Sequence, residues 1–155
     1  MVQKKPELFA LLYVSCSQLG AGERRSAIDN IVRVSQARNR QLRVTGALLA
    51  TERHFAQIIE GPRASIDVLM TSINADPRHR DIIVVASGPC ADRQFSEWAL
   101  AYAGASIFID RKLGAAFRTD RHQSTGRTVI ALMQALLKHR RPSLHGAPAF
   151  PPWED

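Results

Sequence analysis

The sequence predicts an α+β fold of the ferredoxin-like type, in the order βαββαβ with an added fifth strand. Three observations predict this fold. Apolar runs of strand length alternate with two stretches of helical periodicity, a short polar turn joins the second and third runs, and 155 residues suffice for one domain with its own core. In this arrangement the first and third strands lie side by side at the centre of the sheet, and both helices cover one face.

The first half of the chain supplies a strand, a helix and a hairpin. Residues 8–14 form a continuous apolar run, which is typical of a strand covered on both faces. Residues 43–51 and 54–60 flank a polar turn, and together they predict a hairpin. Between the first strand and the hairpin, residues 24–40 predict a helix, because four side chains at helical spacing share one face: Ile28, Ile31, Val32 and Ser35.

The next segments repeat the alternation of helix and strand. A second helix ends at Asp76 and Pro77, since the residue before a proline disfavours helical geometry. Residues 80–88 are rich in β-branched side chains and predict a fourth strand, and the alternating residues 96–104 predict a fifth. The second helix is indicated by four apolar positions at helical spacing: Ile66, Leu69, Met70 and Ile73.

The apolar strands require cover on the second face of the sheet as well. Residues 126–141 predict a helix that supplies this cover, and its basic end suits the helix dipole. We therefore expect a main domain at residues 8–104, a C-terminal helical cap or output segment at 105–141, and a mobile proline-rich tail at 142–155. The apolar surface of the predicted C-terminal helix comprises Val129, Ile130, Leu132, Met133, Leu136 and Leu137.

The composition is that of an ordinary globular protein with a basic charge. The chain is 45% apolar and 23% charged, with a net charge of +7. Its scattered basic segments permit contact with nucleic acid or phosphates without selecting either. No apolar run reaches the roughly 18 residues that cross a bilayer. Cys16 and Cys90 have neither metal-ligand spacing nor a disulfide framework, so we expect no metal site and a location in the reducing cytoplasm.

Gln57 is a polar side chain within the apolar third strand. Without hydrogen-bond partners, its burial costs about 1–3 kcal/mol. Tyr13 lies near the end of the neighbouring first strand, and its hydroxyl needs a partner as well. Ser35 and Asn39 lie one turn apart on the helix face directed at the sheet. The four side chains predict a slot for a neutral heterocycle, and a self-satisfied Tyr–Gln pair in the core is the alternative.

The residue types around this slot form hydrogen bonds but carry no acid–base chemistry. No carboxylate pair, Ser/His/Asp set or metal cluster accompanies them, so we expect that the protein is not an enzyme. An RNA-binding module shares the element order and suits the charge, but its strands carry base-stacking aromatic pairs, whereas the hairpin here carries only Phe55. A small hydrolase of the same fold needs a phosphate-cradling loop after the first strand, which "SCSQLGAGERR" resembles only faintly.

Five segments of the chain resemble the BLUF domain, a blue-light sensor that uses flavin. They are "LFALLYVS", "SQARN" followed by "VTGALL", "HFAQIIEGP", "INADPRHRD" and "FSEWAL", and they occur in family order between about residues 8 and 103. The spacing is specific as well. Asn39 precedes Gln57 by 18 residues and Gln57 precedes Trp98 by 41, as the family pattern requires.

The resemblance implies a photoreceptor that binds FAD non-covalently between the two helices. Tyr13 then passes an electron and a proton to the excited flavin, and Gln57 bridges Tyr13 and the flavin ring. Asn39 donates to the C4 carbonyl of the ring, and Asp76 helps to hold its pyrimidine side. Trp98, on the fifth strand, is expected near the ring with Ser35 as its partner, and light rearranges the Gln57 amide by rotation or by tautomerisation.

The chain departs from the family pattern at three positions. Arg38 stands where many members have a first asparagine, and it can donate to the C2 carbonyl or the pyrophosphate instead. Ser72 replaces a basic residue of the second helix, and Leu100 replaces a methionine two positions after Trp98 and so lacks its polarisable sulfur. These departures leave a flavin-free scaffold as an alternative, beside the RNA-binding module. The sequence does not select between FAD and FMN.

The resemblance also implies that output passes through the fifth strand and the C-terminal helix. The apolar face of that helix suits a homo-oligomer, either a dimer or a larger ring, or an unidentified effector protein. We expect no membrane partner and no nucleic acid.

Overall fold

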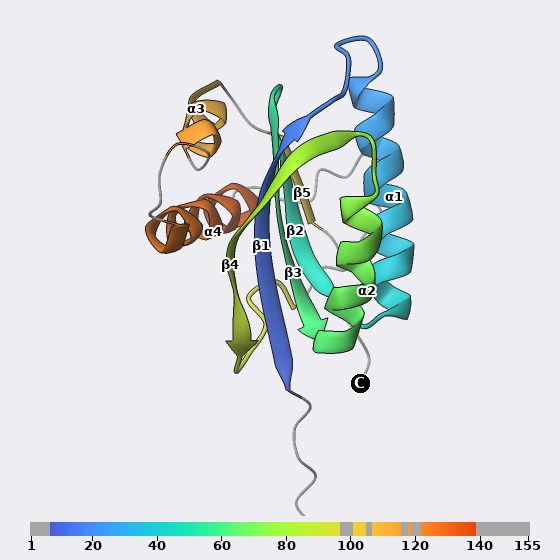
Figure 1. Ribbon diagram of the computed structural model, residues 1–155, viewed down its shortest axis with the longest axis vertical. Coiled ribbons are helices and arrows are strands. Elements are labelled where there is room, and N and C mark those ends of the chain that lie inside the picture. The colour runs from blue at the N-terminus through green and yellow to red at the C-terminus, as the bar shows by residue number, and fades with distance from the viewer. Residues whose placement is uncertain (1–6, 97–100, 105–106, 116–117, 119–121, 139–155) are drawn as a thin grey trace, which may run out of the picture.

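The computed structural model describes residues 7–96, 101–104, 107–115, 118 and 122–138. A five-stranded sheet separates two helices on one face from two helices on the other (Figure 1). The elements in chain order are β1 (Leu8–Ser17), α1 (Arg24–Gln41), β2 (Thr45–Ala50), β3 (His54–Pro62), α2 (Arg63–Asn74), β4 (His79–Cys90), β5 (Ala101–Gly104), α3 (Ile107–Ala115) and α4 (His122–Lys138).

The strand order of the sheet is β4-β1-β3-β2-β5, so β1 and β3 lie at its centre as the sequence predicts. These two strands are antiparallel, and their register places Tyr13 directly opposite Gln57. The hairpin of β2 and β3 is confirmed, and β5 adds to the outer edge of β2 in parallel. The ferredoxin-like α+β fold with an added strand is therefore confirmed.

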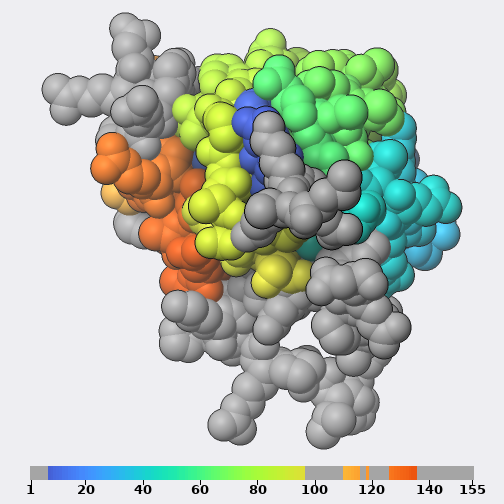
Figure 2. Space-filling model, turned by 90° about the horizontal axis from the view of Figure 1, so that it is seen from below, coloured from blue at the N-terminus to red at the C-terminus, as the bar shows by residue number. Residues whose placement is uncertain are grey.

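Alternation along the strands gives the sheet two apolar faces. On the α1 and α2 face, Phe55 packs with Ile28 of α1, and Ile59 packs with Ile66 of α2. On the opposite face, Leu12 and the neighbouring even-numbered residues of β1 and β3 pack against α4. Figure 2, seen from below, shows α1 and α2 on one side of the strands and α4 on the other. The buried residues of the α4 face are Leu12, Val14, Ala47, Leu49, Ala56, Ile58, Val85, Phe95, Leu113, Val129 and Met133.

A β-bulge interrupts the pairing of β1 with β4 beside Tyr13. Leu12 pairs with Ala86 and Tyr13 with Val84, so Val85 is the extra residue. A bulge bends its strand and redirects the neighbouring side chains. In this strand it lies at the level of the Tyr13–Gln57 pair.

The structure corrects the C-terminal part of the predicted fold. The sequence predicts one helix over residues 126–141, whereas the described residues contain α3 and then α4, which begins at His122. α3 escapes prediction because it is only nine residues long and contains a glycine, so its sequence carries a weak helical signal. The fifth strand begins at Ala101 rather than at residue 96 within the described part. Residues 97–100, which include Trp98 and Leu100, and the tail 142–155 lie outside the described residues.

Among the helices that the structure describes, none combines the length and the apolar character that a bilayer crossing requires.

Candidate functional site

A cleft lies between the α1 and α2 helices and the centre of the sheet. Its volume is about 70 Å³, and it reaches the buried Tyr13–Gln57 pair. A tricyclic ring is larger than this, so a bound flavin requires the side chains that line the cleft to move outward. The lining residues are Tyr13, Ile31, Ser35, Leu48, Phe55, Gln57, Ile73, Asp76, Arg78 and His79.

Tyr13 and Gln57 form the polar pair at the base of this cleft. The Tyr13 hydroxyl donates to Oε1 of Gln57 at 2.5 Å, and both residues are buried. Burial, with a smaller contribution from the charge of Asp76, raises the pKa of Tyr13 far above its ordinary value, so the phenol keeps its proton. The Gln57 amide nitrogen makes no hydrogen bond to any residue that the structure describes, so its two hydrogens remain for a ligand.

The His79 side chain forms one wall of the cleft. The His79 Nε2 lies 2.7 Å from the Ile73 carbonyl oxygen. A carbonyl oxygen only accepts, so Nε2 is the donor of this bond. The Nδ1 atom of the same ring lies 2.7 Å from the Ser15 hydroxyl. The ring also packs edge-on against Tyr13, with centroids 5.9 Å apart, and against Phe55 at 6.1 Å. His79 therefore fixes the Tyr13 ring from the side of β4 and joins α2 to the sheet.

Asp76 lies at the mouth of the cleft in a pair with Arg78. The Arg78 guanidinium donates to both carboxylate oxygens of Asp76, at distances down to 2.6 Å, and also reaches the Asn30 side chain of α1 at 3.3 Å. Hydrogen bonds from Arg78 outweigh partial burial and lower the pKa of Asp76 below its ordinary value. An ionised carboxylate, paired with Arg78, thus lines the cleft as a hydrogen-bond acceptor.

The remaining predicted binding residues differ in their relation to the cleft. Ser35 of α1 lines it, as the helical spacing predicts. Asn39 is 1% exposed and Arg38 is half-buried, but neither is among the lining residues. Ser72 is half-buried on α2 and does not line the cleft either.

Glu60 is a buried carboxylate on the α4 side of β3, three residues after Gln57. It is 1% exposed and accepts hydrogen bonds from the backbone amides of Gln94 at 2.7 Å and Phe95 at 3.0 Å. Desolvation raises the pKa of Glu60, and these hydrogen bonds only partly offset it. Arg93 completes the cluster by donating to the Glu60 carbonyl, the Thr45 hydroxyl and the Arg43 carbonyl. The cluster anchors the turn that directly precedes residues 97–100.

Four residues around the site are not predicted from the sequence: Glu60, Arg78, His79 and Arg93. Residues 78 and 79 follow the predicted end of the second helix, where charged side chains are usually exposed. Glu60 carries a usable signal, since a carboxylate that continues the alternation of a buried strand must find partners. No spacing pattern connects it to Arg93, which lies 33 residues later.

The comparisons with known proteins agree on one family. The model of the BLUF family, described as sensors of blue-light using FAD, matches residues 8–101. The alpha subunit of photoactivated adenylate cyclase from Euglena gracilis is 38% identical over 92 residues, which are 59% of this chain and 9% of that protein. The chain therefore matches less than a tenth of the length of this curated relative.

Solved structures extend the likeness to the whole fold. The dark-state structure of BlrB, a BLUF protein, is 32% identical, has a TM-score of 0.64, and is matched over 82% of this chain and 98% of that one. The ground state of BlsA has a TM-score of 0.70 at 16% identity, over 90% of this chain and 94% of that one, which shows the fold alone. The family match and the resemblance to BlrB identify a sensor module: the chain belongs to the BLUF family, the sensors of blue light using FAD.

Proposed function

We propose that the protein is a blue-light photoreceptor that holds FAD in the Tyr13–Gln57 cleft and signals by rearranging the hydrogen bonds of Gln57. The observation that carries this proposal is the buried Tyr13–Gln57 hydrogen bond at the base of a cleft between helices and sheet. A carboxamide presents a donor at one end and an acceptor at the other, so it has two orientations of almost equal shape. Such a two-state group is what a switch requires.

The hydrogen-bonding groups of the cleft suit the isoalloxazine ring of FAD. Gln57 offers amide hydrogens, Ser35 a hydroxyl and Asp76 a carboxylate that accepts from a ring N–H. Arg38 and Asn39 lie on the same helix as Ser35, and in our proposal they donate to the carbonyl edge or the pyrophosphate once the cleft widens. Trp98 and Leu100, just after the turn anchored by Glu60, complete the proposed site.

The flavin, when bound, supplies the absorption of blue light and a strong acceptor for one electron. Tyr13 is the donor in this proposal, because it is the buried phenol of the cleft and its hydroxyl proton is already directed at Gln57 Oε1. His79 and the bulge beside Tyr13 keep the phenol ring in place. Gln57 then turns or tautomerises, which exchanges the donor and acceptor that its two neighbours meet.

The output is proposed to leave through β5, α3 and α4. We propose that residues 8–104 are the flavin-binding domain and 105–141 the output segment. The photoactivated adenylate cyclases and a bacterial light-regulated adenylyl cyclase combine such a domain with effectors in longer chains. We accordingly propose an effector protein or a homo-oligomer as the partner, in the cytoplasm.

The colour of the purified protein tests the proposal. We expect a yellow protein that releases FAD on heating and shows a small, reversible red shift of its flavin absorption under blue light. Titration of the apoprotein with FAD and FMN measures which cofactor it prefers. A colourless chain that neither cofactor restores would instead support the flavin-free scaffold.

Replacement of Asp76 by asparagine is expected to weaken FAD binding about tenfold, the effect of losing one charge-assisted hydrogen bond of about 1.4 kcal/mol. Flavin fluorescence quenching measures the dissociation constant. Asp67→Asn is the matched control, because Asp67 is also paired with an arginine, Arg63, but its side chain is 62% exposed on α2. If Asp76→Asn and the wild type bind FAD with equal affinity, Asp76 does not take part in FAD binding.

A further inference from the structure

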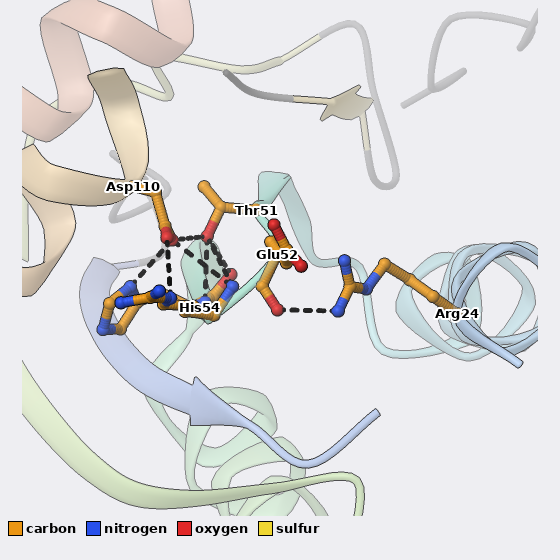
Figure 3. A network of polar contacts seen from close by, with 6 residues as sticks. Arg24, Thr51, Glu52, His54 and Asp110 are labelled. Carbon is orange, nitrogen blue, oxygen red and sulfur yellow. Dashed lines mark hydrogen bonds and ion pairs between the residues drawn. The ribbon is translucent and has the colours of Figure 1, made fainter. Parts of the chain in front are cut away.

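A second buried polar cluster lies at the turn between β2 and β3, outside the flavin cleft. Asp110 of α3 is 8% exposed, and its Oδ1 accepts hydrogen bonds from the Thr51 hydroxyl and, at 2.9 Å, from the His54 ring (Figure 3). The Arg53 backbone amide reaches the same oxygen at 3.4 Å. Burial by itself raises the pKa of Asp110, but the hydrogen bonds from Thr51 and His54 outweigh it and leave the pKa below its ordinary value. Asp110 is therefore an ionised, buried acceptor.

The His54 ring is held by two positions of α3. Because the Asp110 carboxylate only accepts, Nδ1 of His54 carries the hydrogen of their shared bond. Gly114 lies one helical turn after Asp110, and a Cβ atom there would lie only 3.3 Å from Cε1 of His54. α3 thus approaches the ring closely at Gly114 and binds it at Asp110. We name the group Thr51, His54 and Asp110 the α3 clasp.

The turn that carries the α3 clasp is also tied to the other face of the sheet. The Arg24 guanidinium of α1 donates to the Glu52 carbonyl at 2.8 Å, as Figure 3 shows on the opposite side of the turn from Asp110. Further along, α1 lines the flavin cleft with Ile31 and Ser35. Residues 51–54 of one turn therefore connect a helix of the cleft with a helix on the far face.

β3 connects the α3 clasp with Gln57 directly. His54 and Gln57 are three residues apart, so their side chains leave the strand on opposite faces. His54 points to α3, and Gln57 points to the cleft. A displacement of this central strand therefore moves both the His54 and the Gln57 side chains. The family match ends at residue 101, before α3 begins, so the clasp joins the sensor module to a segment beyond it.

We propose that the α3 clasp transmits the light signal: rearrangement of Gln57 shifts the start of β3, weakens the bond between His54 and Asp110, and releases α3. This inference rests on the proposed photoreceptor function. Asp110, Thr51 and His54 act as positioning residues, because none of them lines the flavin cleft. In this proposal α3 moves in response to light, and its apolar residue Leu113, fully buried in the structure, becomes available to a partner.

Amide hydrogen exchange of residues 107–115, measured in the dark and under blue light on the full chain with FAD, tests the inference. In the wild type we expect exchange about tenfold faster in the light, the factor for one lost charge-assisted hydrogen bond. In Asp110→Asn and His54→Ala the dark exchange should already be fast, with no further change in the light. The flavin red shift should keep its wild-type size in both variants, which a general loss of folding would not allow.

Three further variants separate transmission from simple packing. His54→Asn keeps a side-chain N–H close to the position of Nδ1 and should restore the light response of α3. Arg53→Ala is the matched control, because the Arg53 side chain is 80% exposed and lies 3.9 Å from Asp110; it should behave as the wild type. Gly114→Ala crowds the His54 ring without removing a polar group, and it should reduce the light-minus-dark difference even if Asp110→Asn does not fold.

The outcomes distinguish this inference from the proposed function. A wild-type chain without a red shift overturns the photoreceptor function. A wild-type chain with a normal red shift but equal exchange of α3 in dark and light overturns the inference alone, as does an Asp110→Asn variant that retains the full light-minus-dark difference.

Discussion

Tyr13→Phe is expected to give a yellow protein that no longer shifts its absorption under blue light. The phenyl ring keeps the packing against His79, where the ring centroids are 5.9 Å apart, so the cleft and its affinity for FAD remain. The variant lacks the hydroxyl that holds Oε1 of Gln57 at 2.5 Å. It also lacks the easily oxidised phenol, so both the electron donor and the restraint on the amide are lost. Difference absorption spectra before and after illumination measure the result.

Tyr102→Phe is the matched control for this variant, because it removes the only other phenol of the chain. It should retain the red shift. A normal red shift in Tyr13→Phe would refute the role that we assign to Tyr13. Gln57→Leu adds a complementary test, since leucine fills the space without a donor or an acceptor and should also abolish the shift.

Arg93→Ala is expected to lower the free energy of unfolding by about 3 kcal/mol. The guanidinium makes three hydrogen bonds, to Thr45, to the Glu60 carbonyl and to the Arg43 carbonyl. Its removal also takes a positive charge away from the buried Glu60 carboxylate, and removal of one partner from a buried ionic cluster costs about 3–5 kcal/mol. Arg93 is half-buried, so we expect the lower end of that range. Urea unfolding, followed by circular dichroism, measures the change.

Arg80→Ala is the control for Arg93→Ala, because Arg80 is also paired with a carboxylate, Asp81, but its side chain is 64% exposed. It should change stability by less than about 1 kcal/mol. An Arg93→Ala chain as stable as Arg80→Ala would show that the Glu60 cluster adds nothing to the anchoring of the turn before residue 97. In that case Glu60 would be a tolerated buried charge rather than a structural one.

The central part of the site is predictable because it follows from strand periodicity. Tyr13 and Gln57 interrupt two apolar runs, and neighbouring central strands bring such interruptions together; the register indeed pairs them directly. Ser35 is predictable for the same reason on a helix, since its spacing continues the buried face of α1.

His79, Glu60 and Asp110 are not predictable in this way. Each is an ionisable residue whose burial depends on partners more than 15 residues away, and no local sequence pattern identifies those partners. His79 needs Ser15, Glu60 needs the amide of Phe95, and Asp110 needs Thr51. α3 itself is short and contains Gly114, so its helical form depends on tertiary packing rather than on its own propensity.

The opposite orientation of His54 and Gln57 on β3 restricts how this gene can diverge. A slip of the strand by one residue turns every side chain to the other layer, which would send the imidazole toward the cofactor and the carboxamide toward α3. Insertions and deletions in residues 51–53 should therefore be rare among descendants that still sense light, whereas point substitutions there remain permissible. Engineers who graft this sensor onto an enzyme should leave that loop at its present length.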